Sequence, residues 1–230
     1  MTTRPTRPTF SIIIPTLNEA GNITTTLQAT LDSSLDPVPQ IIISDAGSQD
    51  ATLQQAQAFP VRIINSEPGR ARQMNAGAAL ASGDWLLFLH ADTRLPADWQ
   101  KLISQCNVDW GRFNVRLDGQ HWSFRIIERM MNWRSCVSAV ATGDQAIFMR
   151  RDFFHRLGGF PEIPLMEDIA LSKWARRHSR PACLRQPVIT SARRWQKNGI
   201  LRTILLMWSL RLAYWLGVKP ATLYKIYYKK

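Results

Sequence analysis

The sequence predicts an α/β fold built on a mostly parallel central sheet. In the first 90 residues, short apolar runs alternate with helical patterns at the spacing of βαβ units. The apolar runs are continuous, which is typical of strands in a sheet that helices cover on both faces. With 230 residues, 45% of them hydrophobic, the chain is long enough for one large domain and short for two.

The first half contains four expected strands with three helices between them. Continuous apolar runs predict buried strands at residues 10–14, 40–44, 61–65 and 85–89. Helical patterns occupy 22–31, 49–59 and 70–81. Pro15 closes the first strand, Asp50 opens the second helix, and Ser82-Gly83 ends the third helix. Such an order predicts parallel βαβ units.

After Pro96 the strand and helix patterns no longer alternate regularly. Helical patterns are found at 98–106, 123–133, 151–157 and 166–177, and strand patterns at 109–117, 146–149 and 184–190. The helix at 123–133 carries Arg and Glu residues on one side. No internal repeat and no linker-like stretch divides the chain, so this part is expected to complete the same domain.

The charge is distributed unevenly. Residues 1–168 contain 15 Lys and Arg and all 17 Asp and Glu, whereas residues 169–230 contain 14 Lys and Arg and no acidic residue. Such asymmetry indicates a polyanionic partner, which is nucleic acid, an anionic membrane surface or a phosphorylated substrate. The interface-type residues of this tail are Trp208, Tyr214, Trp215, Lys219, Tyr224, Lys225, Tyr227, Tyr228, Lys229 and Lys230.

Residues 199–217 form the most apolar stretch. Arg202 and Arg211 interrupt it, and nine residues of helix separate them by about 13 Å, well under a bilayer core of about 30 Å. A transmembrane span is therefore not expected. Because nine residues also place the two arginines on opposite helix faces, the stretch is not a simple amphipathic helix. Two placements remain open, burial within the fold and contact with a membrane interface.

Several function classes are disfavoured. The three cysteines are far apart and form no Cys-x-x-Cys pair, which argues against a disulfide framework or a zinc ribbon. No apolar segment follows the Thr-, Arg- and Pro-rich N-terminus, so we expect no secretory signal and a cytoplasmic protein, with the inner face of the plasma membrane as a further location. The Gly-x-Gly-x-x-Gly and Gly-Lys-Ser/Thr phosphate loops are absent.

Polar and acidic residues follow the ends of the first four strands, at 15–19, 44–50, 65–69 and 90–93. In an open parallel sheet, ligands bind beyond these carboxyl ends. The carboxylates at these strand ends predict a site for a nucleotide and a divalent metal. Asp92 can hold Mg²⁺ or Mn²⁺ against a diphosphate, and His90 would add a ligand better suited to Mn²⁺.

The ordered motifs resemble family 2 glycosyltransferases. They are Ser11-Ile-Ile-Ile-Pro-Thr-Leu-Asn-Glu19, Ser44-Asp-Ala-Gly-Ser-Gln-Asp-Ala-Thr52, Asn75-Ala-Gly77, Gly83-Asp-Trp-Leu-Leu-Phe-Leu-His-Ala-Asp92, Gly143-Asp144-Gln145, Gly158-Gly159-Phe160 and Glu167-Asp168. The resemblance covers about residues 10–177. It implies a GT-A fold with a Rossmann-like sheet, and transfer of a sugar from a nucleotide-diphosphate donor.

The resemblance also implies roles for individual residues. Pro15, Thr16 and Glu19 would lie along the nucleoside, and Asp45 would accept from the base N–H beside Gly47. The remaining residues of the expected substrate site are Arg72, Asn75 and Asp144. Asp92 would be the metal-binding end of an Asp-x-Asp motif whose first position is His90 in this chain, so the metal would be held by Asp92 and the diphosphate alone.

Glu167-Asp168 matches the acidic pair that supplies the catalytic base in this family. A carboxylate can take the acceptor proton during direct displacement, which inverts the anomeric centre. We expect Asp168 to be the base and Glu167 to shape the acceptor site. Arg193-Arg194-Trp195 is similar to the Arg-Trp part of a motif of processive members, with Ala192 in place of the expected Gln. Arg194 would pair with the diphosphate and Trp195 would stack on an acceptor sugar.

These patterns divide the chain into a flexible N-terminus (1–9), a nucleotide-sugar half (10–95), an acceptor half (96–192) and a basic, aromatic helical segment (193–230). We expect a hexosyltransferase that adds a single sugar to a sugar or lipid-linked acceptor, with no nucleic-acid partner. The alternatives are a non-catalytic polyanion-binding protein, a nucleotidyltransferase, and a catalytically inactive relative, suggested by His90. The first predicts salt-sensitive binding, and the second would need a Gly-rich loop after the first strand.

Overall fold

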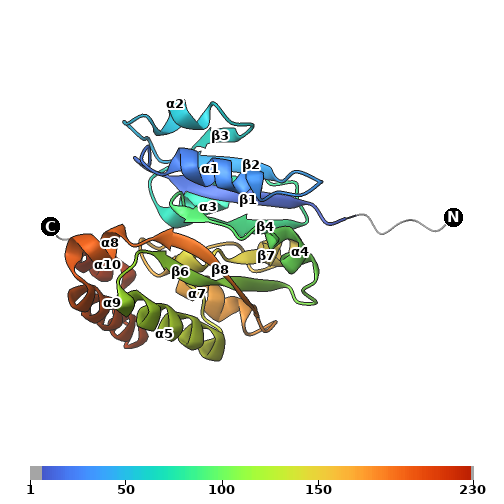
Figure 1. The fold of residues 1–230 in the computed structure, drawn as a ribbon. Helices are drawn as coiled ribbons and strands as arrows, with labels where there is room; N and C mark the ends of the chain where they lie inside the picture. Colours follow the sequence, from blue (N-terminus) through green and yellow to red (C-terminus); the bar gives the residue numbers. More distant parts are fainter. Residues whose placement is uncertain (1–6, 229–230) are drawn as a thin grey trace.

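The computed structural model describes residues 7–228 and contains one eight-stranded sheet in the order β3-β2-β1-β4-β7-β6-β8-β5. Figure 1 shows this sheet running through the molecule with helices packed on it. Residues 1–6 of the expected flexible N-terminus, and Lys229 and Lys230 of the tail, lie outside the described residues.

The first half has the predicted alternation of strands and helices. Its elements are β1 (Phe10–Thr16), α1 (Ile23–Asp32), β2 (Gln40–Asp45), α2 (Thr52–Ala56), β3 (Arg62–Asn65), α3 (Arg70–Ala79) and β4 (Trp85–Phe88). All three strand pairs among these elements are parallel. Helix α2 is shorter at both ends than the predicted 49–59. It begins late because Asp50 accepts hydrogen bonds from the backbone N–H groups of Ala20 and Thr52, which holds residues 49–51 as a loop.

Both faces of the sheet are covered, as the continuous apolar strands predicted. Ile12 and Ile14 of β1 pack on one side with Ile23 and Leu27 of α1. Ile13, between them, packs on the other side with α3, because successive strand side chains point to opposite faces. Helix α3 approaches closely, since a Cβ at Gly77 would lie 2.5 Å from the Ile13 side chain.

The second half makes the sheet mixed. It comprises β5 (Thr93–Arg94), α4 (Trp99–Ser104), β6 (Trp110–Asp118), α5 (Trp122–Ser138), a 3-10 turn η1 (Gly143–Gln145), β7 (Phe148–Arg150), α6 (Arg151–Arg156), α7 (Glu167–Ala175) and β8 (Ala182–Ser191). Strand β7 is antiparallel to both β4 and β6, and the short β5, which the sequence did not predict, is antiparallel to β8. Strands β6 and β8 are parallel.

The C-terminal segment forms three helices, α8 (Arg193–Asn198), α9 (Ile200–Trp215) and α10 (Pro220–Tyr228). Leu210 of α9 and Leu223 of α10 are buried in one apolar cluster with Met166 and Ile169, at the start of α7. The tail is therefore packed onto the same domain. Among residues 7–228, no helix combines the length and the apolar character needed to cross a bilayer.

Candidate functional site

The buried carboxylate of Asp45 holds the loop that follows β2 against the end of β1. Thr16 is paired with Asp45 in the parallel register, and its hydroxyl donates to Asp45 Oδ1 at 2.8 Å. The Ser48 hydroxyl donates to the same oxygen at 2.6 Å. The backbone N–H groups of Gly47 and Ser48 donate to Oδ2 at 2.9 and 2.7 Å. Both Asp45 oxygens are thus satisfied from within the protein.

The charge of Asp45 is fixed by this arrangement. Burial alone would raise the pKa of Asp45, but the hydrogen bonds from Ser48, Thr16 and Gly47 outweigh burial and hold the pKa below its usual range. Gly47 has φ +90°, a conformation that favours glycine. Recognition of a base by Asp45 stays a prediction, and it requires a base N–H to replace an internal donor. Pro15, paired with Ser44 in the same register, precedes this loop.

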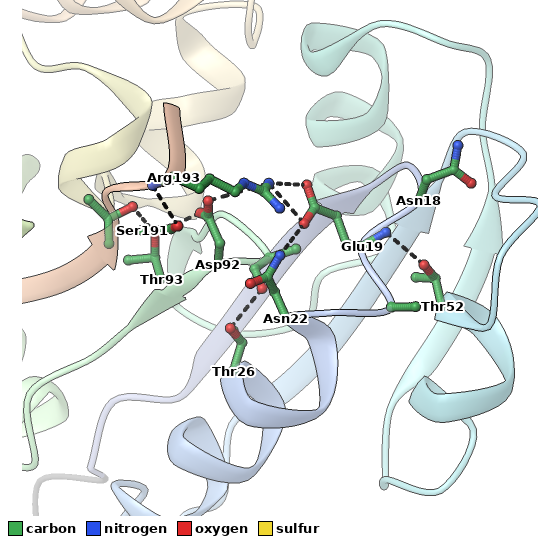
Figure 2. A network of polar contacts seen from close by, with 12 residues as sticks. Asn18, Glu19, Asn22, Thr26, Thr52, Asp92, Thr93, Ser191 and Arg193 are labelled. Atoms are coloured by element: carbon green, nitrogen blue, oxygen red, sulfur yellow. Dashed lines mark hydrogen bonds and ion pairs between the residues drawn. The ribbon is translucent and has the colours of Figure 1, made fainter. Parts of the chain in front are cut away.

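A second group of carboxylates converges on one guanidinium, as Figure 2 shows. Arg193 Nη2 donates to Glu19 Oε1 at 2.7 Å and to Oε2 at 3.0 Å, and lies 3.5 Å from Asp92 Oδ2. Asn22 Nδ2 donates to Glu19 Oε2 at 2.7 Å. These contacts tie the β1 end to the β4 end and to the start of α8. Burial raises the pKa of Asp92, Arg193 opposes this, and the net shift is upward.

The two residues after Arg193 make other contacts. The Arg194 guanidinium carbon is 4.2 Å from the ring centroid of Tyr227 in α10, a cation–π contact. Trp195 packs against the cluster that contains Phe124 and Ile127 of α5. The motif Arg193-Arg194-Trp195 predicted the diphosphate contact for Arg194 and no separate role for Arg193. Successive helical residues differ by about 100° in direction, so a motif two residues wide does not specify which arginine faces a ligand.

The acidic pair begins α7. Asp168 Oδ2 accepts from the Gly143 backbone N–H at 2.8 Å, and Oδ1 accepts from the Ile169 N–H at 2.7 Å. Met166, directly before the pair, has φ +71°, a left-handed conformation that costs a non-glycine residue energy. The position of the acidic pair therefore requires a strained backbone at Met166. Asp168 is partly exposed, whereas Glu167 is buried.

Glu167 faces Arg70 of α3. Arg70 Nη1 lies 3.3 Å from Glu167 Oε1, and the Glu167 side chain is only 3% exposed. Burial and the neighbouring Asp168 raise the pKa of Glu167 to about 7, although Arg70 opposes this. Arg72, which the sequence analysis named, instead bonds the exposed Glu67 and Glu162. Arg70 is a site residue that was not predicted from the sequence. Its side chain leaves the helix about 200° around the axis from that of Arg72.

Asp144 lies in η1, next to Gly143. Burial raises the pKa of Asp144, and the hydroxyl of Thr142, which donates to Asp144, opposes the shift. The positive charges of Arg211 in α9 and Arg134 in α5 also act to lower the pKa of Asp144, so both helices bring positive charge to this carboxylate. Burial and Arg211 in turn lower the pKa of Arg134 to about 10.

His90 packs against the same turn. A Cβ at Gly143 would lie 2.6 Å from His90 Nε2, so only glycine fits beside the imidazole. Nε2 is buried and finds no hydrogen-bond partner among residues 7–228. Burial, with Arg70 and Arg193, lowers the pKa of His90 to about 3, so the ring is neutral at neutral pH.

The donor set at Asp92 suits a hard cation but is incomplete. Glu19 and Asp92 supply carboxylate oxygens, which Mg²⁺ and Mn²⁺ prefer, and a cation, Arg193, already lies between them. Within residues 7–228, no three His, Cys, Asp or Glu side chains gather as a ready-made metal site. A bound cation would take its remaining ligands from a diphosphate.

Two amides of α3 hold the loops around the site. Asn75 Nδ2 donates to the Phe160 carbonyl at 2.8 Å, and the Phe160 N–H donates back to Asn75 Oδ1 at 2.9 Å. Gln73 Nε2 donates to the carbonyls of Thr16 and Ser44 at 2.8 and 2.9 Å. Asn75 was predicted to border the nucleotide, and in the structure its amide secures the Gly159-Phe160 turn. Gln73 was not predicted, because a buried amide has no sequence signature.

The comparisons with known proteins agree with the fold. A family model described as "Glycosyl transferase family 2" matches residues 11–157. A PGL/p-HBAD biosynthesis glycosyltransferase of Mycobacterium tuberculosis is 33% identical over 172 residues, which cover 66% of this chain and 63% of that protein. An uncharacterized glycosyltransferase of Haemophilus influenzae is 33% identical over 85 residues, covering 36% of this chain and 29% of that protein. This chain thus spans less than two thirds of either relative.

Solved structures share the architecture. S. aureus TarS 1–349 in complex with UDP-GlcNAc superposes with a TM-score of 0.64 at 18% identity, covering 80% of this chain and 58% of that one. The mannosyltransferase PcManGT from Pyrobaculum calidifontis, in complex with GDP-Man and Mn²⁺, gives 0.60 at 20% identity, covering 81% of this chain and 57% of that one. At these identities the likeness concerns the fold, which is the GT-A fold that the sequence motifs implied.

Proposed function

This chain belongs to glycosyl transferase family 2, and we propose that it transfers a hexose from a nucleotide-diphosphate sugar to an acceptor hydroxyl with inversion. The observation that carries the proposal is the meeting of Asp168, Gly143 and His90 at the carboxyl edge of the sheet, beside the Glu19–Arg193–Asp92 group. Asp168 can take a proton there, while Asp92 can bind a cation that also binds the donor diphosphate.

Asp168 is proposed as the general base. Each of its oxygens accepts one backbone N–H, which orients the carboxylate and leaves a further lone pair on each oxygen. An acceptor hydroxyl within hydrogen-bond reach would give its proton to Asp168 as it attacks the anomeric carbon. Glu167 is less suited to that role, because it is buried and engaged with Arg70.

Asp92 is proposed to hold the divalent cation together with the donor diphosphate. Such a cation would neutralise the charge on the leaving diphosphate. Arg193 lies within ion-pair distance of Asp92 and is fully charged at neutral pH, so its guanidinium can bind a phosphate oxygen in the same place. The Glu19 contact holds Arg193 there before a donor binds.

The donor is to be sought first among UDP- and GDP-sugars. TarS was crystallised with UDP-GlcNAc and PcManGT with GDP-Man and Mn²⁺. A thermal-shift screen of both donors with and without Mn²⁺ or Mg²⁺ tests this choice, because a ligand stabilises the folded state by RT ln(1 + [L]/Kd).

The deciding experiment compares three variants once a donor is known. Asp168→Asn should lower turnover by about 100-fold to 10,000-fold, the usual contribution of general acid–base catalysis, with donor affinity retained. Glu167→Gln should be milder, and Asp152→Asn, at an exposed carboxylate of α6, should have no effect. Normal turnover in Asp168→Asn would remove Asp168 as the base. Product analysis showing transferred nucleotide in place of sugar would favour a nucleotidyltransferase.

A further inference from the structure

Helix α5 presents a stripe of apolar side chains to solvent. Its members are between 48% and 70% exposed, and they are Trp122, Ile126, Met130, Trp133 and Val137. Their spacing of three and four residues confines them to an arc of about 80° on the helix surface. The opposite face of the same helix, with Phe124 and Ile127, is buried. Helix α5 therefore has two apolar faces, and only one is covered by the protein.

Helix α9 repeats this arrangement. Its exposed stripe consists of side chains between 57% and 73% exposed, namely Leu201, Leu205, Trp208, Leu212 and Trp215. The stripe extends along about 21 Å of helix. Leu210 on the other side is buried against Met166 and Ile169.

The two helices are neighbours. Ile200 and Ile204 of α9 pack in the same cluster as Phe124 and Ile127 of α5, and Figure 1 shows both helices side by side at the lower left of the molecule. Each stripe points away from the core that its own helix joins. We call these two stripes together the α5–α9 face. Ten large apolar side chains on two neighbouring helices exceed what a soluble monomer ordinarily exposes, and such patches mark interaction sites.

The exposed charges that α5, α9 and α10 themselves carry are positive. Arg129 and Arg202 are exposed on the two helices, and Lys219 and Lys225 follow in the tail. Between residues 119 and 143 the one acidic residue is Glu128, which is buried and paired with Arg125 at 3.0 Å. From residue 169 to the end of the sequence there is none.

Exposed apolar stripes together with positive charge indicate which kind of partner binds the α5–α9 face. Pairing with a second copy of the α5–α9 face would bring two acid-free basic surfaces together, which like-charge repulsion opposes. A bilayer with anionic headgroups offers apolar chains to the stripes and negative charge to the arginines and lysines. Four of the ten stripe residues are tryptophans, the residue type enriched at membrane–water interfaces. We infer that the α5–α9 face docks the protein, with both helices lying in the interface plane, on a lipid bilayer containing anionic lipids.

The test is flotation of the full chain with two kinds of vesicle, phosphatidylcholine alone and phosphatidylcholine with anionic phosphatidylglycerol. Binding should be strong to the anionic vesicles at low salt and should weaken as salt screens the charges. The double variant Trp133→Ser/Trp208→Ser should bind at least about tenfold more weakly, because each tryptophan contributes a large apolar area. Trp174→Ser, at an exposed tryptophan of α7 outside the α5–α9 face, should bind as the wild type does.

A second variant keeps the test decisive if the double serine variant fails to fold. Arg129→Glu/Arg202→Glu leaves both apolar stripes intact and should bind anionic vesicles more weakly than the wild type. Circular dichroism reports whether each variant is folded. The inference is overturned if the wild type binds no vesicle at low salt, or if Trp174→Ser weakens binding as much as the double variant does. It is also overturned if sedimentation shows a wild-type dimer that the double tryptophan variant abolishes, and the wild type does not bind vesicles. Catalytic activity does not enter any of these measurements.

Discussion

Replacing Glu167 with glutamine should remove a pH dependence from the stability of the protein. The Glu167 side chain is 3% exposed, and burial together with Asp168 raises its pKa from 4.5 to about 7. Because the folded-state pKa lies above the unfolded value, the folded protein binds more protons than the unfolded chain between pH 4.5 and 7. The contribution of this group is therefore fully present below pH 4.5 and is lost as the pH rises through 7.

The size of the effect follows from the shift. One pKa unit corresponds to about 1.4 kcal/mol, so a shift of about 2.5 units costs the folded state on the order of 3 kcal/mol between pH 4 and pH 8. Glutamine cannot titrate, so Glu167→Gln should lack this loss. Arg70 would lose its partner, but its side chain is 40% exposed and water can solvate it.

The assay is urea unfolding of the wild type, Glu167→Gln and the control Glu162→Gln at pH 5 and pH 8. Glu162 is an exposed glutamate that also pairs with an arginine of α3. We expect the wild type and the control to lose more free energy of unfolding than Glu167→Gln as the pH rises, by on the order of 3 kcal/mol. Equal losses in all three proteins would refute the argument that burial holds a proton on Glu167.

Three further predictions concern the remaining parts of the site. Asp45→Asn should lower the free energy of unfolding at pH 7 by about 1–3 kcal/mol, because it weakens four hydrogen bonds to a buried charge, and chemical denaturation measures this loss. Gly143→Ala should cost about 1–3 kcal/mol through the contact of its Cβ with His90, and an unchanged melting temperature would contradict that packing. Arg193→Ala should strengthen Mn²⁺ binding to the free protein about twofold to fivefold in calorimetry, since it removes the guanidinium beside Asp92, and unchanged affinity would show that the two cations use different places.

The layers of the fold were predictable because they depend on local patterns. The continuous apolar strands β1, β2 and β4 can be buried on both faces only in a sheet covered by helices. The parallel order follows from the helices between them. By contrast, nothing local marks β7 as antiparallel to its neighbours, because its direction is set by where the chain returns to the sheet after α5.

The candidate site was predictable as a place and less so as a set of contacts. The ends of β1 at Thr16 and of β2 at Asp45, with the segment after β4 that contains Asp92, identify the carboxyl edge of the sheet, and the structure has Asp45 and Asp92 there. Arg70 and Arg193, which bond the carboxylates, are each one or two residues from the arginine that the sequence analysis named. Side-chain direction rotates by about 100° per helical residue, so a short motif identifies the turn but not the contacting atom.

The apolar stretch at 199–217 shows why two placements remained open in the sequence. Arg202 and Arg211 lie on opposite sides of α9, and between them the helix carries one apolar arc that is buried around Leu210 and another that is exposed around Trp208. Burial in the fold is thus confirmed for one arc, while membrane contact is our inference for the other. Helix α5 has the same two arcs, but a hydrophobic period does not say which apolar face meets the core. Only the packing of α5 and α9 on the domain shows which faces the protein leaves uncovered.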